Sequence, residues 1–525
     1  MSQYAIIGSG LSAIATAKAL IKKGVKPIIF DIGDTLPIDK KIIASKLSNR
    51  TPNQWPSEQV EIITDNPTIT SKNEFPKKLL FGSDYFYGRS TKQFPIESTN
   101  TIPPFSNAQG GLSMGWGAAS LPPTDEDINN WPIKVIDLKK YFIEVLSTLP
   151  YSAKEDNLSN YFPTYHKNLN PIILSPANEA LLSMLNSNFD SLEHLNVAFG
   201  QARVLTHAPH NNKEGCKYCG YCMSGCVYDY IYKADHDLQK LINSNKIIYV
   251  KNTSVISVEE TTEYTSICLI NSNKNVEHHK FKRIFLAGGA VNSTRVILNS
   301  RKIFQEIASL KSTEGFIAPL LSLRKLPFTW PNTNTQPGIF IEFKNLNISN
   351  HWIHTQMSAP NELVMKKLGI NNQNKNISQI IRRKLSQHLA IAHCNLHSDH
   401  GSSYELSLDK ENGILTSTKK INVGTENDII QAINQLKKIC KIINYTLLKP
   451  FCRDTLKTGS FHVGGSLPMK NKPEKPTDTN LYGSPTGWKN IHVVDSSIFP
   501  SIPGTTIGLL AMANATRIVQ NLDFS

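Results

Sequence analysis

The sequence of 525 residues lacks the long hydrophobic segments that a membrane-spanning chain requires. Its longer apolar runs, such as residues 317–321, fall far short of the ~20 residues that cross a bilayer. The first three residues lead directly into the apolar segment 4–7, without the basic region and cleavage site of a signal peptide. We therefore predict a cytoplasmic protein with no transmembrane segment.

Cysteine is also scarce, with eight residues in the whole chain. Four of them lie within residues 216–226, and Cys268, Cys394, Cys440 and Cys452 are scattered. This distribution is typical of a ligand cluster rather than of a disulfide framework.

Acidic residues are fewer than basic ones, which gives a formal net charge of +14. Most of this excess is spread along the chain, but one stretch without any acidic residue carries Lys366, Lys367, Lys375, Arg382, Arg383 and Lys384. We expect a solvated surface there, with contact to an acidic partner or a membrane surface as the alternative. We predict no nucleic-acid partner.

The amino-terminal residues have the pattern of a dinucleotide site. Residues 4–7 and 28–30 are predicted strands, and residues 13–22 a helix. Gly8 permits a tight turn, and Gly10 lets the backbone approach a pyrophosphate at the helix N-terminus, with Leu11 and Ser12 completing the turn. Asp31 ends the second strand, where a carboxylate accepts hydrogen bonds from a ribose.

Three later blocks are rich in small residues: 110–117, followed by 131–141; 284–293; and 492–500, continuing to 515. In this order they resemble the glucose-methanol-choline (GMC) oxidoreductases. The resemblance implies FAD as the cofactor. It also implies an α/β fold in which a Rossmann-type FAD-binding domain is interleaved in sequence with an antiparallel-sheet substrate domain of α+β type.

The resemblance also implies domain limits and further cofactor-binding residues. The FAD-binding domain would comprise residues 1–130, 201–300 and 456–525, and the substrate domain residues 131–200 and 301–455. Predicted strands include 247–250, 254–258, 338–343 and 404–408, and residues 371–376 are an asparagine-rich surface loop. The expected contacts to FAD are Gly110, Gly111, Ser113, Trp116, Gly117, Val255, Ala287, Gly288, Asp495 and Thr506.

His462 resembles the catalytic histidine of the family, and a histidine can accept the hydroxyl proton of an alcohol near neutral pH. The family usually adds a second His or Asn from the carboxy-terminal block. Residues 502–508 offer Thr505 and Thr506 instead, and neither replaces a histidine as a base. A separate group, His393, His397, Asp399 and His400, resembles a strand running into a turn, and we predict no metal there.

Cys216, Cys219, Cys222 and Cys226 have the spacing of thiolates that wrap an iron-sulfur cluster. Val227 stands where ferredoxin motifs carry proline. Some GMC dehydrogenases relay electrons through such a loop, so an iron-sulfur cluster and an electron-accepting partner are predicted. Zinc, and metal-free thiols or disulfides, stay open as alternatives.

The leading hypothesis is an FAD-dependent enzyme that oxidises the CH–OH group of a small-molecule alcohol, such as a sugar, a sterol-like molecule or another lipid. The alternatives are a redox-neutral lyase on the same fold and a noncatalytic flavin- or cluster-binding partner in an assembly.

Overall fold

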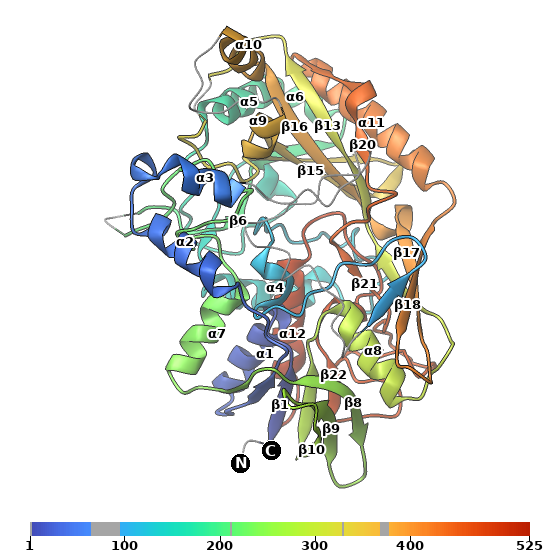
Figure 1. Cartoon of the computed structure of the whole chain (residues 1–525). Helices are drawn as coiled ribbons and strands as arrows, with labels where there is room; N and C mark the ends of the chain where they lie inside the picture. The colour runs from blue at the N-terminus through green and yellow to red at the C-terminus, as the bar shows by residue number, and fades with distance from the viewer. Residues whose placement is uncertain (1–2, 65–94, 211–212, 328–329, 368–376, 525) are drawn as a thin grey trace.

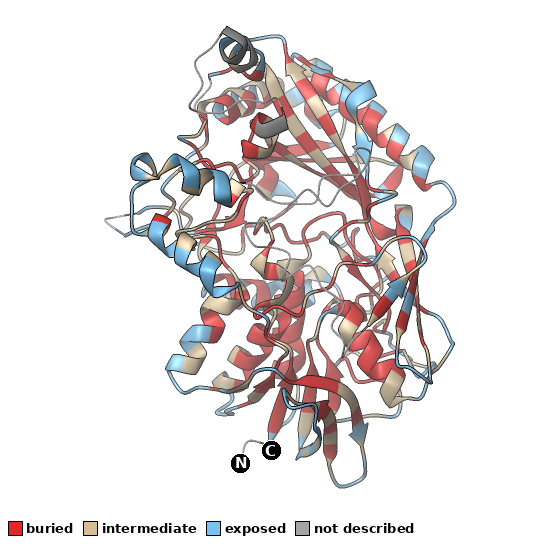
Figure 2. Cartoon of the chain, in the orientation of Figure 1, coloured by how far each residue is buried: buried red, intermediate tan, exposed pale blue. Residues whose placement is uncertain are grey.

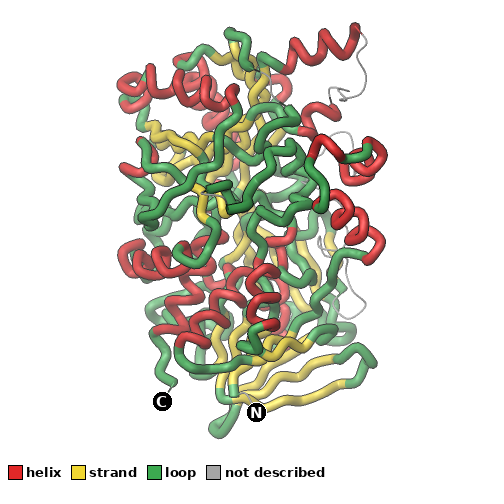
Figure 3. The backbone as a smooth tube through the Cα atoms, turned by 90° about the vertical axis from the view of Figure 1, so that its left-hand side faces the viewer, coloured by secondary structure: helices red, strands yellow, loops and turns green. Residues whose placement is uncertain are grey.

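The computed structural model describes residues 3–64, 95–210, 213–327, 330–367 and 377–524 of the chain (Figure 1). Both chain ends lie at the same end of the molecule, beside the parallel sheet (Figures 1 and 3). The structure is a mixed α/β arrangement of one parallel sheet and several sheets with antiparallel pairing. The asparagine-rich segment 371–376 lies outside the described residues, and Lys375 with it.

The parallel sheet has the strand order β22-β11-β1-β2-β7. Its strands are β1 (Tyr4–Ile7), β2 (Ile28–Phe30), β7 (Ile248–Val250), β11 (Arg283–Leu286) and β22 (Ile491–Val493). Helix α1 (Leu11–Lys22) connects β1 to β2, and these two strands pair in parallel. The strand–helix–strand unit that the amino-terminal pattern predicts is therefore confirmed, with the helix starting two residues earlier than expected.

Three further helices share the core of this sheet with α1. They are α4 (Val135–Leu146), α7 (Ala234–Asn243) and α12 (Gly508–Gln520). Helix α12 is buried along nearly its whole length, because small residues such as Ala511, Ala513 and Ala515 allow close packing. Figure 2 shows this buried centre between more exposed outer elements.

Residues 254–258 form a strand, as expected, but it lies in a separate antiparallel sheet. The order is β10-β9-β8, with β8 (Ser254–Glu260), β9 (Thr265–Ile270) and β10 (Val276–Phe281). This sheet lies beside the parallel one at the end of the molecule that carries the termini (Figure 1).

A larger sheet occupies the opposite part of the molecule, with the order β19-β13-β16-β15-β14-β5 and β20 paired to β13. Its strands are β5 (Val197–Gln201), β13 (Glu314–Ser322), β14 (Ile339–Asn345), β15 (Ser349–Ser358), β16 (Leu389–Leu396), β19 (Tyr445–Leu447) and β20 (Arg453–Asp454). All pairings are antiparallel. The predicted strand 338–343 corresponds to β14.

Alternation along these strands gives the sheet two different faces. Phe316, Ala318 and Leu320 of β13 pack into an apolar core. The helices over this face are α5 (Pro176–Ser187), α6 (Phe189–Glu193) and α11 (Thr425–Ile442). The intervening residues, such as Ile317, point to the opposite face, where they line a cavity.

A third sheet, β21-β12-β17-β18-β3, connects the two parts. Its strands are β3 (Ile96–Ser98), β12 (Ala308–Ser312), β17 (Ser402–Leu408), β18 (Leu415–Ile421) and β21 (Val463–Gly464). The predicted strand 404–408 lies within β17. A short ribbon pairs β4 (Tyr151–Ser152) with β6 (Val204–Leu205).

The remaining helices differ in how far they are buried. They are α2 (Ile38–Ser48), α3 (Ser57–Thr64), α8 (Ala290–Ser300), α9 (Glu362–Lys367) and α10 (Ile377–Ser386). Residues 131–200 carry the helices α4, α5 and α6 before β5 joins the large sheet. Helix α4 packs in the core of the parallel sheet, so this segment contributes to both parts.

Candidate active site

A cavity of about 1090 Å³ runs from the carboxyl end of β1 to the face of the large sheet. It is lined by most of the residues that the sequence singles out for a cofactor. These are Gly8, Gly10, Leu11, Ser12, Asp31, Gly111, Ser113, Trp116, Gly117, Val255, Ala287, Gly288, Asp495 and Thr506. Gly110 lies beside this lining and outside it. His462 lines the same cavity, so the structure brings the predicted base and the predicted cofactor residues together.

The glycine turn at the start of α1 is held tightly against β11. Gly8 has φ +98°, and a Cβ there would lie 2.6 Å from the Ala287 carbonyl oxygen. The N-terminus of α1 begins at Gly10 with no side-chain cap, so its free N–H groups face the cavity lining. At position 8, only glycine fits the positive φ and the close approach to the Ala287 carbonyl.

Asp31 is buried at the end of β2 and is hydrogen-bonded on one oxygen. Its Oδ2 accepts from Ser9 Oγ at 2.5 Å and from Tyr249 Oη at 2.9 Å. Burial raises the pKa of Asp31 to about 7, and these two hydrogen bonds oppose that rise. Ser9 also accepts from the Gly110 N–H at 2.9 Å, so it ties the turn, the acid and the second glycine block to each other.

The loop that carries Gly110 and Gly111 lies directly on the first glycine turn. Gly110 and Gly111 both have positive φ, and a Cβ on Gly111 would lie 3.3 Å from the Cα of Gly10. Ser113 Oγ donates to the Gly110 carbonyl at 2.6 Å. Trp116 Nε1 donates to the Tyr232 carbonyl at 2.6 Å, which fixes the ring beside the start of α12.

Asp495 holds the turn before α8 in place. Its oxygens accept from Ser293 Oγ at 2.5 Å, the Gly289 N–H at 2.9 Å, and Ser497 through both N–H and Oγ. Both oxygens of the Asp495 carboxylate therefore already accept hydrogen bonds from the protein. At the cavity, Asp495 supports the 287–293 turn. Nearby, the amide atoms Asn107 Nδ2 and Asn292 Oδ1 are buried without partners in the described structure, and both residues line the cavity.

His462 lies just before β21 and is half-buried in the cavity wall. Its carbonyl accepts from the Thr313 N–H at 3.1 Å, and its own N–H donates to Ser460 Oγ at 3.2 Å. Burial lowers the pKa of His462 to about 3, and the neighbouring His354 and His393 contribute in the same direction. The ring is therefore neutral over the ordinary pH range, and its Nδ1 has no partner among the described residues.

The large sheet presents polar side chains to the same cavity. His393 and Asn395 of β16 and Gln356 of β15 line it from the sheet side. Gln356 lies opposite His393 across the strand pair. Burial lowers the pKa of His393 to about 4, so this ring is neutral as well.

A buried acid–histidine pair stands behind Gln356. His354 Nδ1 lies 2.6 Å from Glu342 Oε1, and its Nε2 lies 3.1 Å from Gln356 Nε2. Both His354 and Glu342 are completely buried. Because Gln356 donates to His354, its position at the cavity wall is fixed by the pair.

The sequence does not reveal this set of polar residues. Gln356 and His354 are remote in sequence from His462, and only the pairing of β15 with β16 and the packing of β12 against β21 bring them together. The signal available in the sequence is alternation of polar residues within an apolar strand, His354-x-Gln356 and His393-x-Asn395, which indicates a face directed at a functional surface.

The four residues grouped in sequence around His397 separate in space. His393 faces the cavity, whereas His400 Nδ1 lies 2.9 Å from Asp428. His397 and Asp399 instead meet His351 from β15, and their ligand atoms lie within 4.8 Å of one another. The rings of His351 and His397 stack at 3.7 Å with a 20° interplanar angle, so their lone pairs run nearly side by side and do not converge on one ion. The expectation of no metal stays a prediction.

The cysteine loop lies between β6 and α7. Three backbone N–H groups, of Tyr218, Tyr230 and Thr335, point at the sulfurs of Cys216, Cys226 and Cys222 respectively, each at 3.4 Å. Burial raises the pKa of the Cys216, Cys219 and Cys222 thiols, and the neighbouring thiols of the loop add to the rise. Met223 of this loop lines the main cavity.

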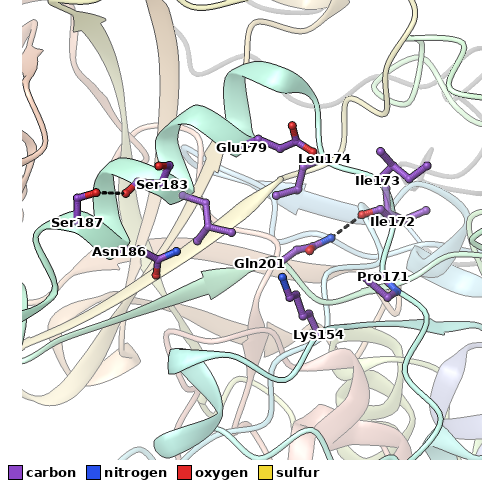
Figure 4. Close-up of a pocket in the computed structure, with 11 residues that line it drawn as sticks. Lys154, Pro171, Ile172, Ile173, Leu174, Glu179, Ser183, Asn186, Ser187 and Gln201 are labelled. Atoms are coloured by element: carbon purple, nitrogen blue, oxygen red, sulfur yellow. Dashed lines mark hydrogen bonds between the residues drawn. The ribbon is translucent and has the colours of Figure 1, made fainter.

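A second hollow of about 690 Å³ lies beside α5 (Figure 4). Gln201 Nε2 donates to the Ile172 carbonyl at 2.5 Å there. The charged side chains that line it are Lys154 and Glu179. The residues that the sequence singles out for a cofactor and a base line the main cavity and not this hollow.

Comparisons with known proteins identify a family model and similar solved structures. Residues 425–515, which include His462, Asp495 and Thr506, match the family model described as GMC oxidoreductase. The structure is similar over 99% of its length to 99% of the crystal structure of pyridoxine 4-oxidase from Mesorbium loti, with a TM-score of 0.59 and 11% sequence identity. At that identity the similarity shows a shared fold. No curated protein matches the sequence.

Within the described residues, no helix is both long enough and apolar enough to cross a membrane.

Proposed function

We propose that this chain, which belongs to the GMC oxidoreductases and is therefore an FAD-dependent enzyme, oxidises the CH–OH group of an apolar alcohol with His462 as the base. One observation carries the proposal. A single cavity joins the glycine turn and Asp31 to His462 and to an apolar sheet face.

The residues around the first half of the cavity fit FAD. The uncapped N-terminus of α1 supplies N–H donors for a pyrophosphate, and the glycines leave no side chain in its way. Asp31 stands where a ribose would donate to it. Asn107 Nδ2 and Asn292 Oδ1 offer a donor and an acceptor that the protein leaves unused. When bound, the flavin would accept the hydride.

In this proposal residues 1–130, 201–300 and 456–525 form a Rossmann-type FAD-binding domain. Residues 131–200 and 301–455 form the substrate domain. The strand–helix–strand unit supports the first assignment, and the antiparallel sheet over the cavity supports the second.

His462 takes the hydroxyl proton. Oxidation of the alcohol breaks the C–H and O–H bonds and forms the carbonyl, so one hydride and one proton leave the substrate together. A neutral imidazole ring can accept that proton, and the low pKa of His462 keeps the ring neutral before reaction. Burial in the cavity wall also excludes water from the proton transfer.

The second polar group comes from the large sheet in place of the carboxy-terminal block. Thr506 Oγ1 already accepts from the Leu121 N–H at 2.8 Å, and Thr505 is fully buried away from the cavity lining. His393 and Asn395 instead line the same cavity as His462. They would hydrogen-bond the substrate oxygen and hold it toward the base.

The substrate class follows from the wall beyond these polar residues. Leu321, Leu389 and Ile391 line it from the sheet, and the outer part of the cavity is also apolar. A sugar would leave many hydroxyl groups without partners there, at about 1–3 kcal/mol each. A lipid-like alcohol buries apolar surface against the same wall.

The cysteine loop fits a multinuclear thiolate cluster better than a single zinc ion. Tetrahedral zinc, with bonds of about 2.3 Å to sulfur, draws its thiolates within about 4 Å of one another. Within the described residues the cysteines form no group of three that lies within 4.8 Å. Three backbone N–H groups point at the sulfurs, and the thiolates of iron-sulfur clusters accept hydrogen bonds of this kind. We propose that the four cysteines hold such a cluster and pass electrons to a carrier.

Anaerobic mixing of the FAD-loaded protein with medium-chain alcohols tests the main proposal. We expect bleaching of the flavin absorbance, and His462→Ala should keep the flavin but slow bleaching by about 10²–10⁴-fold. His400→Ala, a half-buried histidine outside the cavity lining, serves as the control and should bleach normally. Turnover without bleaching would indicate a lyase, and neither turnover nor bleaching a noncatalytic flavoprotein.

Iron and acid-labile sulfide analysis of anaerobically purified protein tests the cysteine loop. We expect iron in the wild type and its loss in Cys219→Ser. Cys268→Ser should retain iron, since Cys268 lies in β9 and outside the cysteine loop. A wild-type protein without iron contradicts the relay.

A further inference from the structure

The cavity opens at its far end between α10, β16 and the short helix η6 (Lys449–Phe451). Leu385 and Phe451 line this mouth, yet their side chains are 50% and 62% exposed. Arg453 lies beside them and is also exposed. Large apolar side chains that are this exposed around a cavity opening indicate an interaction surface that is covered by other apolar groups.

Two more exposed apolar residues extend this patch. Leu323, 68% exposed, follows β13, and Ile380, 48% exposed, lies on α10. Hydrogen bonds make the segments contiguous. The Leu326 N–H donates to the Gln387 carbonyl at 2.7 Å, and the Leu448 N–H donates to the Pro319 carbonyl at 3.0 Å.

Basic side chains surround the apolar patch. The loop after β13 carries Arg324 and Lys325, α10 carries Lys384, and η6 carries Lys449, all exposed. The end of α11 adds Lys441, next to the contact between the Leu323 N–H and the Asn444 carbonyl at 3.1 Å. The acidic side chain in these segments is Asp454, which follows Arg453.

We propose that this mouth docks on an anionic membrane surface. The apolar side chains at the mouth would enter the boundary between headgroups and acyl chains, and the basic side chains would contact lipid phosphates. This inference rests on the proposed function, which gives the docking its purpose. An apolar alcohol resides in the membrane and would enter the cavity without crossing water. Helix α10 stands at the end of the molecule opposite β9 and β10 (Figure 1), so docking leaves the termini free.

Vesicle flotation with FAD-loaded protein tests the docking without any turnover. Vesicles of phosphatidylcholine with phosphatidylserine should bind the protein, and vesicles of phosphatidylcholine alone should bind it much more weakly. The double variant Lys325→Glu/Lys384→Glu should bind anionic vesicles at least about thirtyfold more weakly, because each basic residue near the surface contributes about fivefold. The matched control is Lys274→Glu/Lys282→Glu, which makes the same charge change around β10 and should bind normally.

The same variants separate this inference from the proposed function. Lys325→Glu/Lys384→Glu should still show normal flavin bleaching by a short, water-soluble alcohol, so loss of bleaching there would count against the chemistry and not against docking. Equal binding to neutral and anionic vesicles, equal loss in both double variants, or no vesicle binding by the wild type would overturn the docking. A dimer that Lys325→Glu/Lys384→Glu disrupts would overturn it in favour of a second copy of the chain.

Discussion

Asp31→Asn should stabilise the cofactor-free protein and weaken its binding of FAD. Burial raises the Asp31 pKa to about 7 from an ordinary value near 4. A carboxyl whose pKa is raised on folding binds more protons in the folded state, so its contribution to stability is full below pH ~4 and falls as the pH rises toward ~7. The fall is about 4 kcal/mol at most, at about 1.4 kcal/mol per pH unit.

The asparagine removes this cost but loses some hydrogen bonding. The Ser9 and Tyr249 hydroxyls both donate to Asp31, and an amide oxygen accepts them less strongly than a carboxylate, which costs about 1 kcal/mol each. The net gain at pH 8 is therefore about 2 kcal/mol. In a chain of this size that corresponds to an increase of about 2 °C in the midpoint of thermal unfolding. At pH 4 the gain should largely disappear, because Asp31 is then protonated in the folded state and the pH is close to its ordinary pKa in the unfolded state.

Thermal unfolding of the cofactor-free variant and wild type at pH 4 and pH 8 measures this difference, and FAD titration measures the binding. We expect the dissociation constant for FAD to rise about 10- to 100-fold, through loss of a charge-assisted hydrogen bond to the ribose. Asp39→Asn, which changes an exposed acid in α2, is the control for both assays. An equal gain in stability at both pH values would refute the buried charge as its cause, and unchanged FAD affinity would refute the ribose contact.

Three further predictions concern the reacting end of the cavity and its support. The rate of flavin reduction should stay constant from pH 5 to pH 8, because the pKa of His462 is about 3; a fall in rate centred near pH 6.5 in stopped-flow measurements would contradict this. His393→Phe should raise KM and lower the reduction rate about 10-fold by removing a hydrogen bond to the substrate oxygen, with no change in bound flavin per chain. Lys419→Met should destabilise the protein by about 3–5 kcal/mol, because the fully buried Glu314, 2.7 Å from Lys419 Nζ, would lose its ion-pair partner; urea unfolding checks this, and Lys420→Met on the exposed side of β18 should have little effect.

The amino-terminal site could be predicted because its determinants are local. Gly8, Gly10 and Asp31 lie within one strand–helix–strand unit, and each is required by a backbone conformation or a charge that the short segment itself creates. Ser9 escaped prediction although it lies between the glycines. Its role depends on Gly110, which is about one hundred residues away and reaches it only after the second loop folds onto the turn.

The sheet side of the cavity could not be predicted for the same physical reason. Which strand pairs with β16, and in which register, decides whether Gln356 stands beside His393, and a shift by one residue would turn both away from the cavity. His393 was therefore grouped with His397 by proximity in sequence. In the structure the two belong to different surroundings, one at the cavity and one stacked on His351.

The relative position of His462 and His393 depends on one continuous segment of chain. Strand β12 pairs with β21, and the next residue, Thr313, donates its N–H to the His462 carbonyl. The chain then continues into β13, where Ile317 pairs with His393. Residues 308–317 thus hold the base and the sheet face in register through backbone hydrogen bonds, which do not depend on how the larger parts pack. Under the proposed function, a base on one part of the chain would therefore work with a hydrogen-bonding group on another, and the carboxy-terminal block would need no second histidine.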